Sequence, residues 1–363
     1  MLSVEIYSQY ESVLPFCVYA NGKLFEGSVN LNILLSGVLV FFFLCGCDKG
    51  VPVEDSKNPC GRSIPCTSYD LSNAPPGKIV FSAVTEYGIR DSVYNNYYDQ
   101  QQLFMVNPDG TELQQITDFK LEVYELTLSP DGSRIAFTSW GPEGTGVNTQ
   151  YIYVYGRSDS SLFRLSDFPL GEPQGLTWSP DGKRIAYYFC VNCEGFGTND
   201  EIFVIDVETK QIARLTDTLA ADSRPTWSPH GTQIAFYSNR DDPITRQGEL
   251  YIIDIETGAL SRLTCTPESE GIPSWSPDGC HLAFSYQSKL QIIDLREPSA
   301  KNAVSSFGIF GGQIRWSPDA KELAQLDGFS LYVLSADGTG RRLVHQFPQG
   351  VSAYRSLQWV AVP

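Results

Sequence analysis

Short runs of alternating hydrophobic and polar residues fill the chain from residue 77 onward, and turn-forming residues separate them. One pattern recurs: an aromatic or apolar residue, then Ser-Pro-Asp-Gly or a close variant, then an apolar run of the Ile-Ala-Phe type. It occurs as LSPDGSRIAF from Leu128, WSPDGKRIAY from Trp178, WSPHGTQIAF from Trp227, WSPDGCHLAF from Trp275 and WSPDAKELAQ from Trp316. The spacings between these positions are 50, 49, 48 and 41 residues. A period of about 40 to 50 residues with several strands per unit is typical of propeller blades.

Each repeat divides into four expected strands. The first ends at the tryptophan position, and Ser-Pro-Asp-Gly forms the turn after it, because Pro presets φ and Gly takes the left-handed position. The Ile-Ala-Phe run is the second strand. A third follows, such as EIFVID from Glu201 or ELYIID from Glu249, and then a turn and a fourth strand such as SRLT from Ser261. Four antiparallel strands make one blade.

The two ends of the repeat region complement each other. KIVFSA from Lys78, LFMV from Leu103 and QQIT from Gln114 supply strands two to four of a unit without a first strand. SLQWVAVP from Ser356 supplies a lone first strand, with Trp359 in the tryptophan position. Pairing these segments closes a ring and leaves no free edge. We therefore predict an all-β, six-bladed β-propeller over residues 77–363, with the C-terminal strand completing the N-terminal blade.

These repeats resemble those of the TolB-like propeller family. The W-S-P-D-G-x-x-I-A-F, L-Y-x-x-D and R-L-T strings carry the resemblance across residues 77–363. The resemblance implies an exported protein that uses the region around its channel mouth for partners. TolB proteins carry a separate α/β domain before the propeller, whereas here a Pro/Gly-rich linker, residues 48–76, precedes the repeats.

An apolar block, LNILLSGVLVFFFL, occupies residues Leu31 to Leu44. Its 14 residues suit a signal-peptide core and fall short of the roughly 20 needed to span a bilayer. The block runs into Leu44-Cys45-Gly46-Cys47, which resembles a bacterial lipobox with Cys47 as the lipid-bearing residue. We expect residues 1–47 to be a signal peptide and lipobox whose true start lies downstream of Met1. An uncleaved anchor and plain secretion are the alternatives.

Export to the cell envelope permits disulfide bonds. Cys60 and Cys66 lie close together in the linker, and Cys190 and Cys193 form a C-x-x-C pair. We expect disulfides at both places, and a metal site at the C-x-x-C pair is the alternative.

The sequence offers little for metal binding or catalysis. His230 and His281 fall on the face of the Ser-Pro-Asp-Gly turns, and His345 falls near the opposite face, so they cannot converge on one metal. No G-x-S-x-G string occurs. We therefore expect no catalytic residues, no metal and no cofactor. The formal net charge of −16 argues against a nucleic-acid partner, because phosphate binding needs clustered Lys and Arg.

The face opposite the Ser-Pro-Asp-Gly turns carries long connections between strands two and three. In blade one, SAVTEYGIRDSVYNNYYDQQQ contributes Tyr94, Tyr97 and Tyr98, and tyrosine clusters suit protein recognition. Alternatively, these connections are tolerated insertions. Residues three or four positions before each tryptophan position are expected at the channel mouth on the same face: Tyr124, Glu125, Gln174, Arg224, Gln313 and Arg355.

These observations predict a non-catalytic binding scaffold, anchored in the bacterial cell envelope by lipid on Cys47, that contacts an envelope protein through this face. A propeller enzyme or a carbohydrate-binding protein acting on an extracellular polymer is the alternative, because carboxylates could still do acid–base work in the channel.

Overall fold

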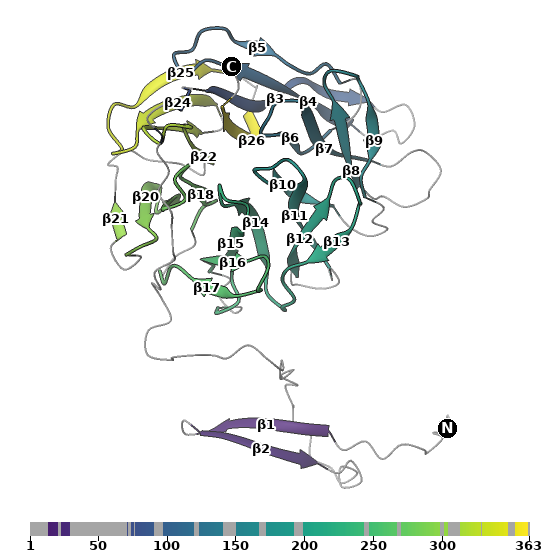
Figure 1. Ribbon diagram of the computed structural model, residues 1–363, viewed down its shortest axis with the longest axis vertical. Helices are drawn as coiled ribbons and strands as arrows, with labels where there is room; N and C mark the ends of the chain where they lie inside the picture. Colours follow the sequence, from purple (N-terminus) through teal and green to yellow (C-terminus); the bar gives the residue numbers. More distant parts are fainter. Residues whose placement is uncertain are drawn as a thin grey trace. The chain divides into compact units, whose positions relative to one another are not determined.

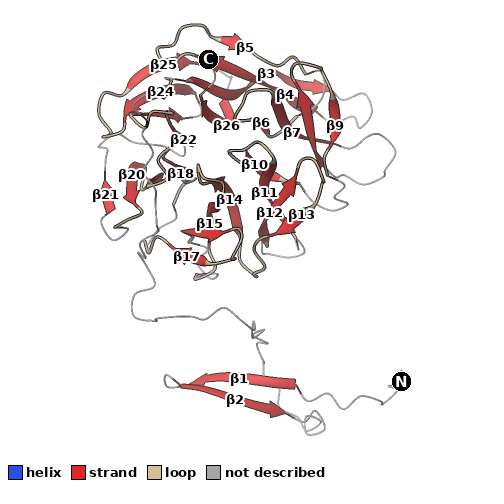
Figure 2. Ribbon diagram, viewed as in Figure 1, coloured by secondary structure: helices blue, strands red, loops and turns tan. Residues whose placement is uncertain are grey.

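The computed structural model describes residues 14–20, 23–29, 71, 74–75, 77–90, 97–119, 123–140, 150–166, 172–191, 199–242, 247–266, 270–297, 301–303, 313–327, 329–347 and 353–361. The chain divides into two units, Met1–Lys57 and Asn58–Pro363. Within the described residues every regular element is a strand (Figure 2). No helix with the length and apolar character needed to cross a membrane occurs among them.

The first unit contains one antiparallel hairpin, in which β1 (Leu14–Ala20) pairs with β2 (Lys23–Val29). These strands lie in the segment expected to precede the apolar signal-peptide core. The apolar block and Cys47 fall outside the described residues.

The second unit is a ring of six four-stranded antiparallel sheets (Figure 1). Blade one contains β26 (Ala353–Val360), β3 (Lys78–Arg90), β4 (Tyr97–Val106) and β5 (Gln114–Gln115). Blade two contains β6 (Leu126–Leu128), β7 (Arg134–Trp140), β8 (Gln150–Gly156) and β9 (Leu162–Arg164), and blade three contains β10 (Gln174–Trp178), β11 (Arg184–Cys190), β12 (Asp200–Asp206) and β13 (Ile212–Arg214). Blade four contains β14 (Asp222–Trp227), β15 (Gln233–Ser238), β16 (Glu249–Asp254) and β17 (Leu260–Arg262).

Blade five contains β18 (Ser274–Trp275), β19 (His281–Tyr286), β20 (Lys289–Asp294) and β21 (Lys301–Ala303), and blade six contains β22 (Gln313–Trp316), β23 (Glu322–Leu326), β24 (Ser330–Ser335) and β25 (Arg342–Gln346). The predicted ring closure is confirmed, since β26 pairs with β3 and places Trp359 opposite Ile79. Figure 1 shows β26 in yellow and β3 in dark blue side by side.

Tryptophans join four of the blades to the blade before them. Four indole Nε1 groups donate, each at 3.2 Å, to the main-chain oxygen of the residue before the tryptophan position in the preceding blade. The pairs are Trp178 to Thr127, Trp227 to Thr177, Trp275 to Thr226 and Trp316 to Ser274. Arg134 stacks on Trp178 and Arg184 stacks on Trp227, with guanidinium-to-ring distances of 5.0 and 4.9 Å. The apolar clusters accordingly lie between neighbouring blades.

The Ser-Pro-Asp-Gly turns are held by their own side chains. In blade two, the Ser129 hydroxyl donates to Asp131 at 2.6 Å and accepts from the Arg134 N–H at 2.9 Å. Gly132 has a φ of 72°, which favours glycine. The same serine–aspartate pair recurs in blades three, five and six. We call the face with these turns the turn face and the opposite face the loop face.

The long connection expected in blade one is largely strand, which corrects the sequence-based interpretation. β3 continues to Arg90 and β4 begins at Tyr97, with Arg90 opposite Tyr97 and Ile89 opposite Tyr98. Tyr97 and Tyr98 therefore lie on a strand extension and not in a loop, and Tyr94 lies outside the described residues.

Candidate functional site

The innermost strands of the six blades surround a cavity of about 490 Å³. Side chains alternate between the two sides of a strand, so residues at odd distances before the tryptophan position face the channel. The residue three positions before it lines the cavity in all six blades: Glu125, Gly175, Arg224, Ile272, Gln313 and Ser356. The residue one position before it lines the cavity in four: Thr127, Thr177, Arg315 and Gln358.

The inner strands of blades three and four share a register shift near their loop-face ends. The register of β10 shifts between Gln174 and Thr177, and the register of β14 shifts at the matching place. At the shift, Gly175 has a φ of 63° and Arg224 a φ of 58°. A non-glycine residue in this left-handed region is uncommon and costs on the order of 1 kcal/mol or more. Arg224 therefore occupies a backbone position that blade three fills with glycine.

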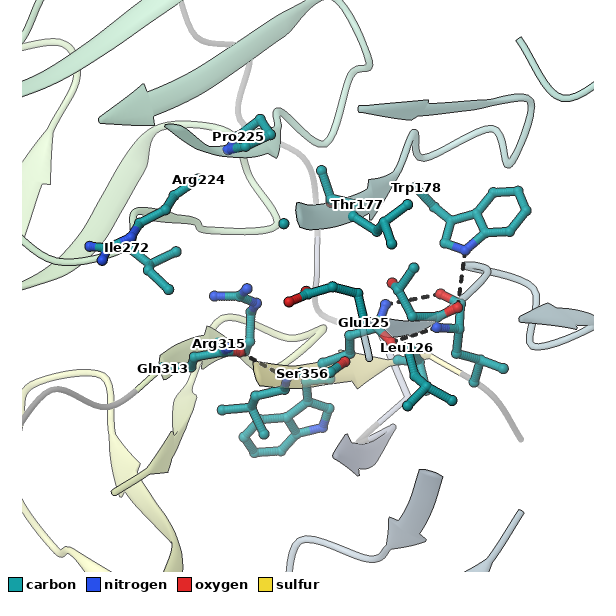
Figure 3. Close-up of a pocket in the computed structure, with 18 of the residues that line it drawn as sticks. Glu125, Leu126, Thr177, Trp178, Arg224, Pro225, Ile272, Gln313, Arg315 and Ser356 are labelled. Carbon is teal, nitrogen blue, oxygen red and sulfur yellow. Dashed lines mark hydrogen bonds between the residues drawn. The ribbon is translucent and has the colours of Figure 1, made fainter. Parts of the chain in front are cut away.

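Three of the side chains that line the cavity carry charge: Glu125, Arg224 and Arg315. Figure 3 shows that Glu125 and Arg315 point toward one another, whereas Arg224 reaches toward Ile272. Burial lowers the pKa of Arg315 to about 10, so the guanidinium stays charged at neutral pH. Its Nη1 donates to the main-chain oxygen of Ile314 at 2.7 Å.

The remaining lining is polar and partly occupied by contacts that hold the ring. Tyr188 donates to the amide oxygen of Gln174 at 3.0 Å. The Gln313 amide oxygen accepts from the Leu357 N–H at 2.8 Å, which links blades six and one. The channel thus combines fixed amide and hydroxyl groups with two cationic side chains.

Four of the expected channel-mouth residues line the cavity, namely Glu125, Gln174, Arg224 and Gln313. Tyr124 does not. Its ring packs edge-on against Trp140 and its hydroxyl accepts from the Trp140 indole at 2.8 Å. Arg355 lies in β26 next to the lining residue Ser356, and its side chain is not described.

Sequence reasoning missed Arg315, although it lies on the same side of its strand as Gln313 and the alternation could have revealed it. It also missed two of the cysteines. Cys265 and Cys280 are each disulfide-bonded, as is Cys190 of the C-x-x-C pair. Cys193, Cys60 and Cys66 lie outside the described residues.

None of the three histidines is among the residues that line the cavity. His281, at the start of β19, is 3.4 Å from Asp278 in the adjacent turn. His345 lies on β25 and packs against Phe81 and Phe347, and burial lowers its pKa. Among the described residues, no group of three or more His, Cys, Asp or Glu side chains could hold a metal ion.

The loop face exposes apolar side chains where strands end. Leu219, in the connection from β13 to β14, is 95% exposed, and Phe329, in the turn from β23 to β24, is 63% exposed. A buried ion pair lies three residues beyond Leu219 in the chain. Asp222 is 0% exposed and pairs with Arg240 at 2.7 Å, and Arg240 stacks on Tyr251. This ion pair and the stacking contact stabilise the loop face at blade four.

A six-bladed β-propeller with a polar, two-arginine channel is the class of protein that this fold and site define. The TolB beta propeller domain family matches residues 78–293, and the chain belongs to that family. This bears out the resemblance read from the repeat strings.

Individual relatives match over smaller segments. The chain is 27% identical over 141 residues to a Bacillus subtilis protein named "Uncharacterized peptidase YuxL", covering 39% of this chain and 19% of that protein. It is 25% identical over 173 residues to a TolB homologue of Chlorobium chlorochromatii, covering 47% of this chain and 36% of that protein. The chain thus matches only 19% and 36% of the length of these two curated relatives. The crystal structure of TolB from Acinetobacter baumannii superposes with a TM-score of 0.59 at 19% identity, over 80% of this chain and 69% of that one, which shows the fold alone.

Proposed function

We propose that this protein is a non-catalytic binding scaffold of the bacterial cell envelope, which contacts another envelope protein through its loop face. The observation that carries the proposal is the exposure of Leu219 and Phe329 on that face. Burial of a large exposed apolar side chain under a partner is favourable, and we take these two side chains as candidate contacts of the loop face.

The chemistry of the channel supports binding over catalysis. Its charged lining residues are one carboxylate and two guanidinium groups, and no histidine or cysteine is among the lining residues of the described chain. A general acid–base pair or an activated nucleophile needs titratable groups that converge on one reacting atom. The match to the peptidase-named relative covers only 19% of that protein, so its name does not favour an enzyme here.

Membership of the TolB beta propeller domain family and the lipobox-like Leu44-Cys45-Gly46-Cys47 support an envelope location. In this proposal Cys47 carries the lipid and holds the propeller at a membrane surface. Fatty-acid labelling of the chain with and without Cys47→Ala tests this step. Label that survives the substitution would refute lipidation at Cys47 and would leave the proposed scaffold role unaffected.

Affinity capture from the solubilised envelope of the source organism tests the scaffold role. The intact propeller is compared with a loop-face variant, Leu219→Glu with Phe329→Glu. The matched control is Leu113→Glu, because Leu113 is also exposed, at 44%, but lies at the turn before β5 on the turn face. A protein retained by the parent and the control, and lost by the loop-face variant, supports the proposal. Equal retention by all three would place binding elsewhere.

A further inference from the structure

We propose that the central channel is a carboxylate-binding site in which Arg224 and Arg315 hold the anionic group. The proposal deepens the scaffold function and rests on it for one source of the carboxylate, an acidic segment of the partner protein. A small carboxylate compound is the other source.

The charge of the channel is opposite to that of the protein. The chain has a formal net charge of −16, whereas the charged residues among the described part of the lining are two arginines and one glutamate, a net charge of plus one. Cationic groups inside a low-dielectric cleft concentrate anions there. An acidic ligand would therefore be repelled by the outer surface and attracted by the channel.

Among the described residues neither arginine forms an ion pair with a carboxylate, although Arg315 and Glu125 point toward one another (Figure 3). Within the described residues, Arg224 makes no hydrogen bond or ion pair and rests its guanidinium 5.7 Å from the Tyr237 ring centroid. Arg315 bonds only to the main chain of its own neighbour, Ile314. Arg224 is exposed to the channel, whereas Arg315 is half-buried, and most arginines buried to that degree pair with an acid. These two side chains keep their planar donor groups available, and a carboxylate fits that donor geometry.

The repeats show that the propeller does not require arginine at either position. Thr127, Thr177 and Thr226 stand where Arg315 stands in its blade, and Gly175 stands where Arg224 stands. Arg224 moreover adopts a φ of 58° that glycine adopts without strain. A residue that costs backbone energy and whose one described side-chain contact is a long stacking contact with Tyr237 is expected at a binding site.

The two arginines lie at different depths. Arg224, three positions before Trp227, is nearer the loop-face end, and Arg315, one position before Trp316, is deeper. The main-chain oxygens of Thr127 and Thr177, which would suit a cation, already accept from tryptophan indoles. This arrangement favours an anion that enters from the loop face.

The chain's own repeats provide test variants that are expected to fold. Arg315→Thr installs the residue of blades two to four, and Arg224→Gly installs the residue of blade three. The full chain is titrated with a fluorescein-labelled alternating Glu-Gly peptide and with the Gln-Gly counterpart, by fluorescence polarisation. We expect the acidic peptide to bind, the amide peptide to bind at least about tenfold more weakly, and each variant to lose about tenfold, as for charge-assisted hydrogen bonds.

Controls separate this site from general charge effects. Arg296→Gln, on the turn face beside Asp294, removes the same charge elsewhere and is expected to leave binding unchanged. Glu125→Gln removes the negative charge of the cavity and is expected to tighten binding. Urea unfolding of each variant verifies folding.

Competition with citrate distinguishes the sources of the carboxylate. The site is assigned to a small carboxylate if citrate displaces the peptide from the parent, binds more tightly than the peptide and requires both arginines. Equal binding of the amide peptide, or binding unchanged by both arginine variants, would overturn the proposal. If neither probe binds while the loop-face capture still succeeds, the channel proposal is wrong and the scaffold role stands.

Discussion

The amide side chain of Gln358 makes two hydrogen bonds to the main chain of Leu128, accepting from its N–H at 2.8 Å and donating to its carbonyl oxygen at 2.9 Å. Leu128 occupies the tryptophan position of blade two and is fully buried. At the junctions where an indole bridges the blades, the tryptophan itself makes the connection. At the junction of blades one and two, Gln358 of the preceding blade makes the connection instead, and its two hydrogen bonds link β26 to β6.

Replacement of Gln358 by Leu would leave both main-chain groups of Leu128 without these partners. A buried polar group that loses its partner costs about 1–3 kcal/mol, so we expect a loss of about 2–4 kcal/mol in the free energy of unfolding. Urea unfolding followed by tryptophan fluorescence measures it. Gln211→Leu, an exposed glutamine in the turn before β13, is the matched control and should change little. A loss no larger than that of the control would show that the ring closes through strand pairing alone.

Trp227→Phe tests the indole bridges. The substitution keeps an aromatic ring between blades three and four but removes the donor to Thr177, and it weakens the stacking of Arg184. We expect a loss of about 1–2 kcal/mol in unfolding free energy. The same substitution at Trp140, whose indole bonds within blade two to Tyr124, should cost less because no blade junction is involved. An equal cost at both positions would contradict a special role for the bridges.

The blades could be predicted from the sequence because their determinants are local. Proline, aspartate and glycine set each turn through their own φ preferences and side-chain hydrogen bonds, and the repeat then fixes where strands begin. Ring closure was predictable because Trp359 marks a first strand without successors.

The site was less predictable, because strand irregularities change which side chains face inward. In β10 the register shift lets Gln174, four positions before Trp178, line the channel. β6 shows no shift, so Tyr124, at the same distance before Leu128, turns to Trp140 instead. Register shifts near Glu86 also break the alternation of β3, which concealed the strand extension. Such bulges leave little trace in sequence.

The turn aspartates should make stability fall at acid pH. Hydrogen bonds from Ser129 and the Ser133 N–H lower the pKa of Asp131 to about 2. A carboxyl group whose pKa is lower in the folded state stabilises the fold above its unfolded pKa of about 4, and the contribution is lost as pH falls toward 2. Asp131→Asn should therefore destabilise at pH 7 and differ less from the parent at pH 2. Urea midpoints at both pH values measure this, and a difference that grows on acidification would contradict the sign.

The Asp222–Arg240 pair provides a test of buried charge. Arg240→Met would leave the fully buried Asp222 carboxylate without its cation, which costs about 3–5 kcal/mol for such pairs. Asp222→Asn in addition should recover part of the loss, because the buried group is then neutral. Arg296→Met, which breaks the exposed pair with Asp294, is the control and should change stability little. No recovery in the double variant would mean that Arg240 acts mainly through its stacking on Tyr251.

Asp200 is expected to behave in the opposite way to the turn aspartates. Its carboxyl group makes no hydrogen bond within the described residues, and burial, together with the nearby charge of Asp222, raises its pKa. A carboxyl group whose pKa is higher in the folded state penalises folding above that folded pKa, and the penalty disappears below the unfolded pKa of about 4. Asp200→Asn should therefore stabilise the protein at pH 7 and have little effect at pH 3.5. Paired urea titrations at the two pH values measure the difference, with Asp131→Asn as the variant of opposite sign. Destabilisation by Asp200→Asn at pH 7 would show that the ionised carboxylate has a favourable role at the junction of blades three and four.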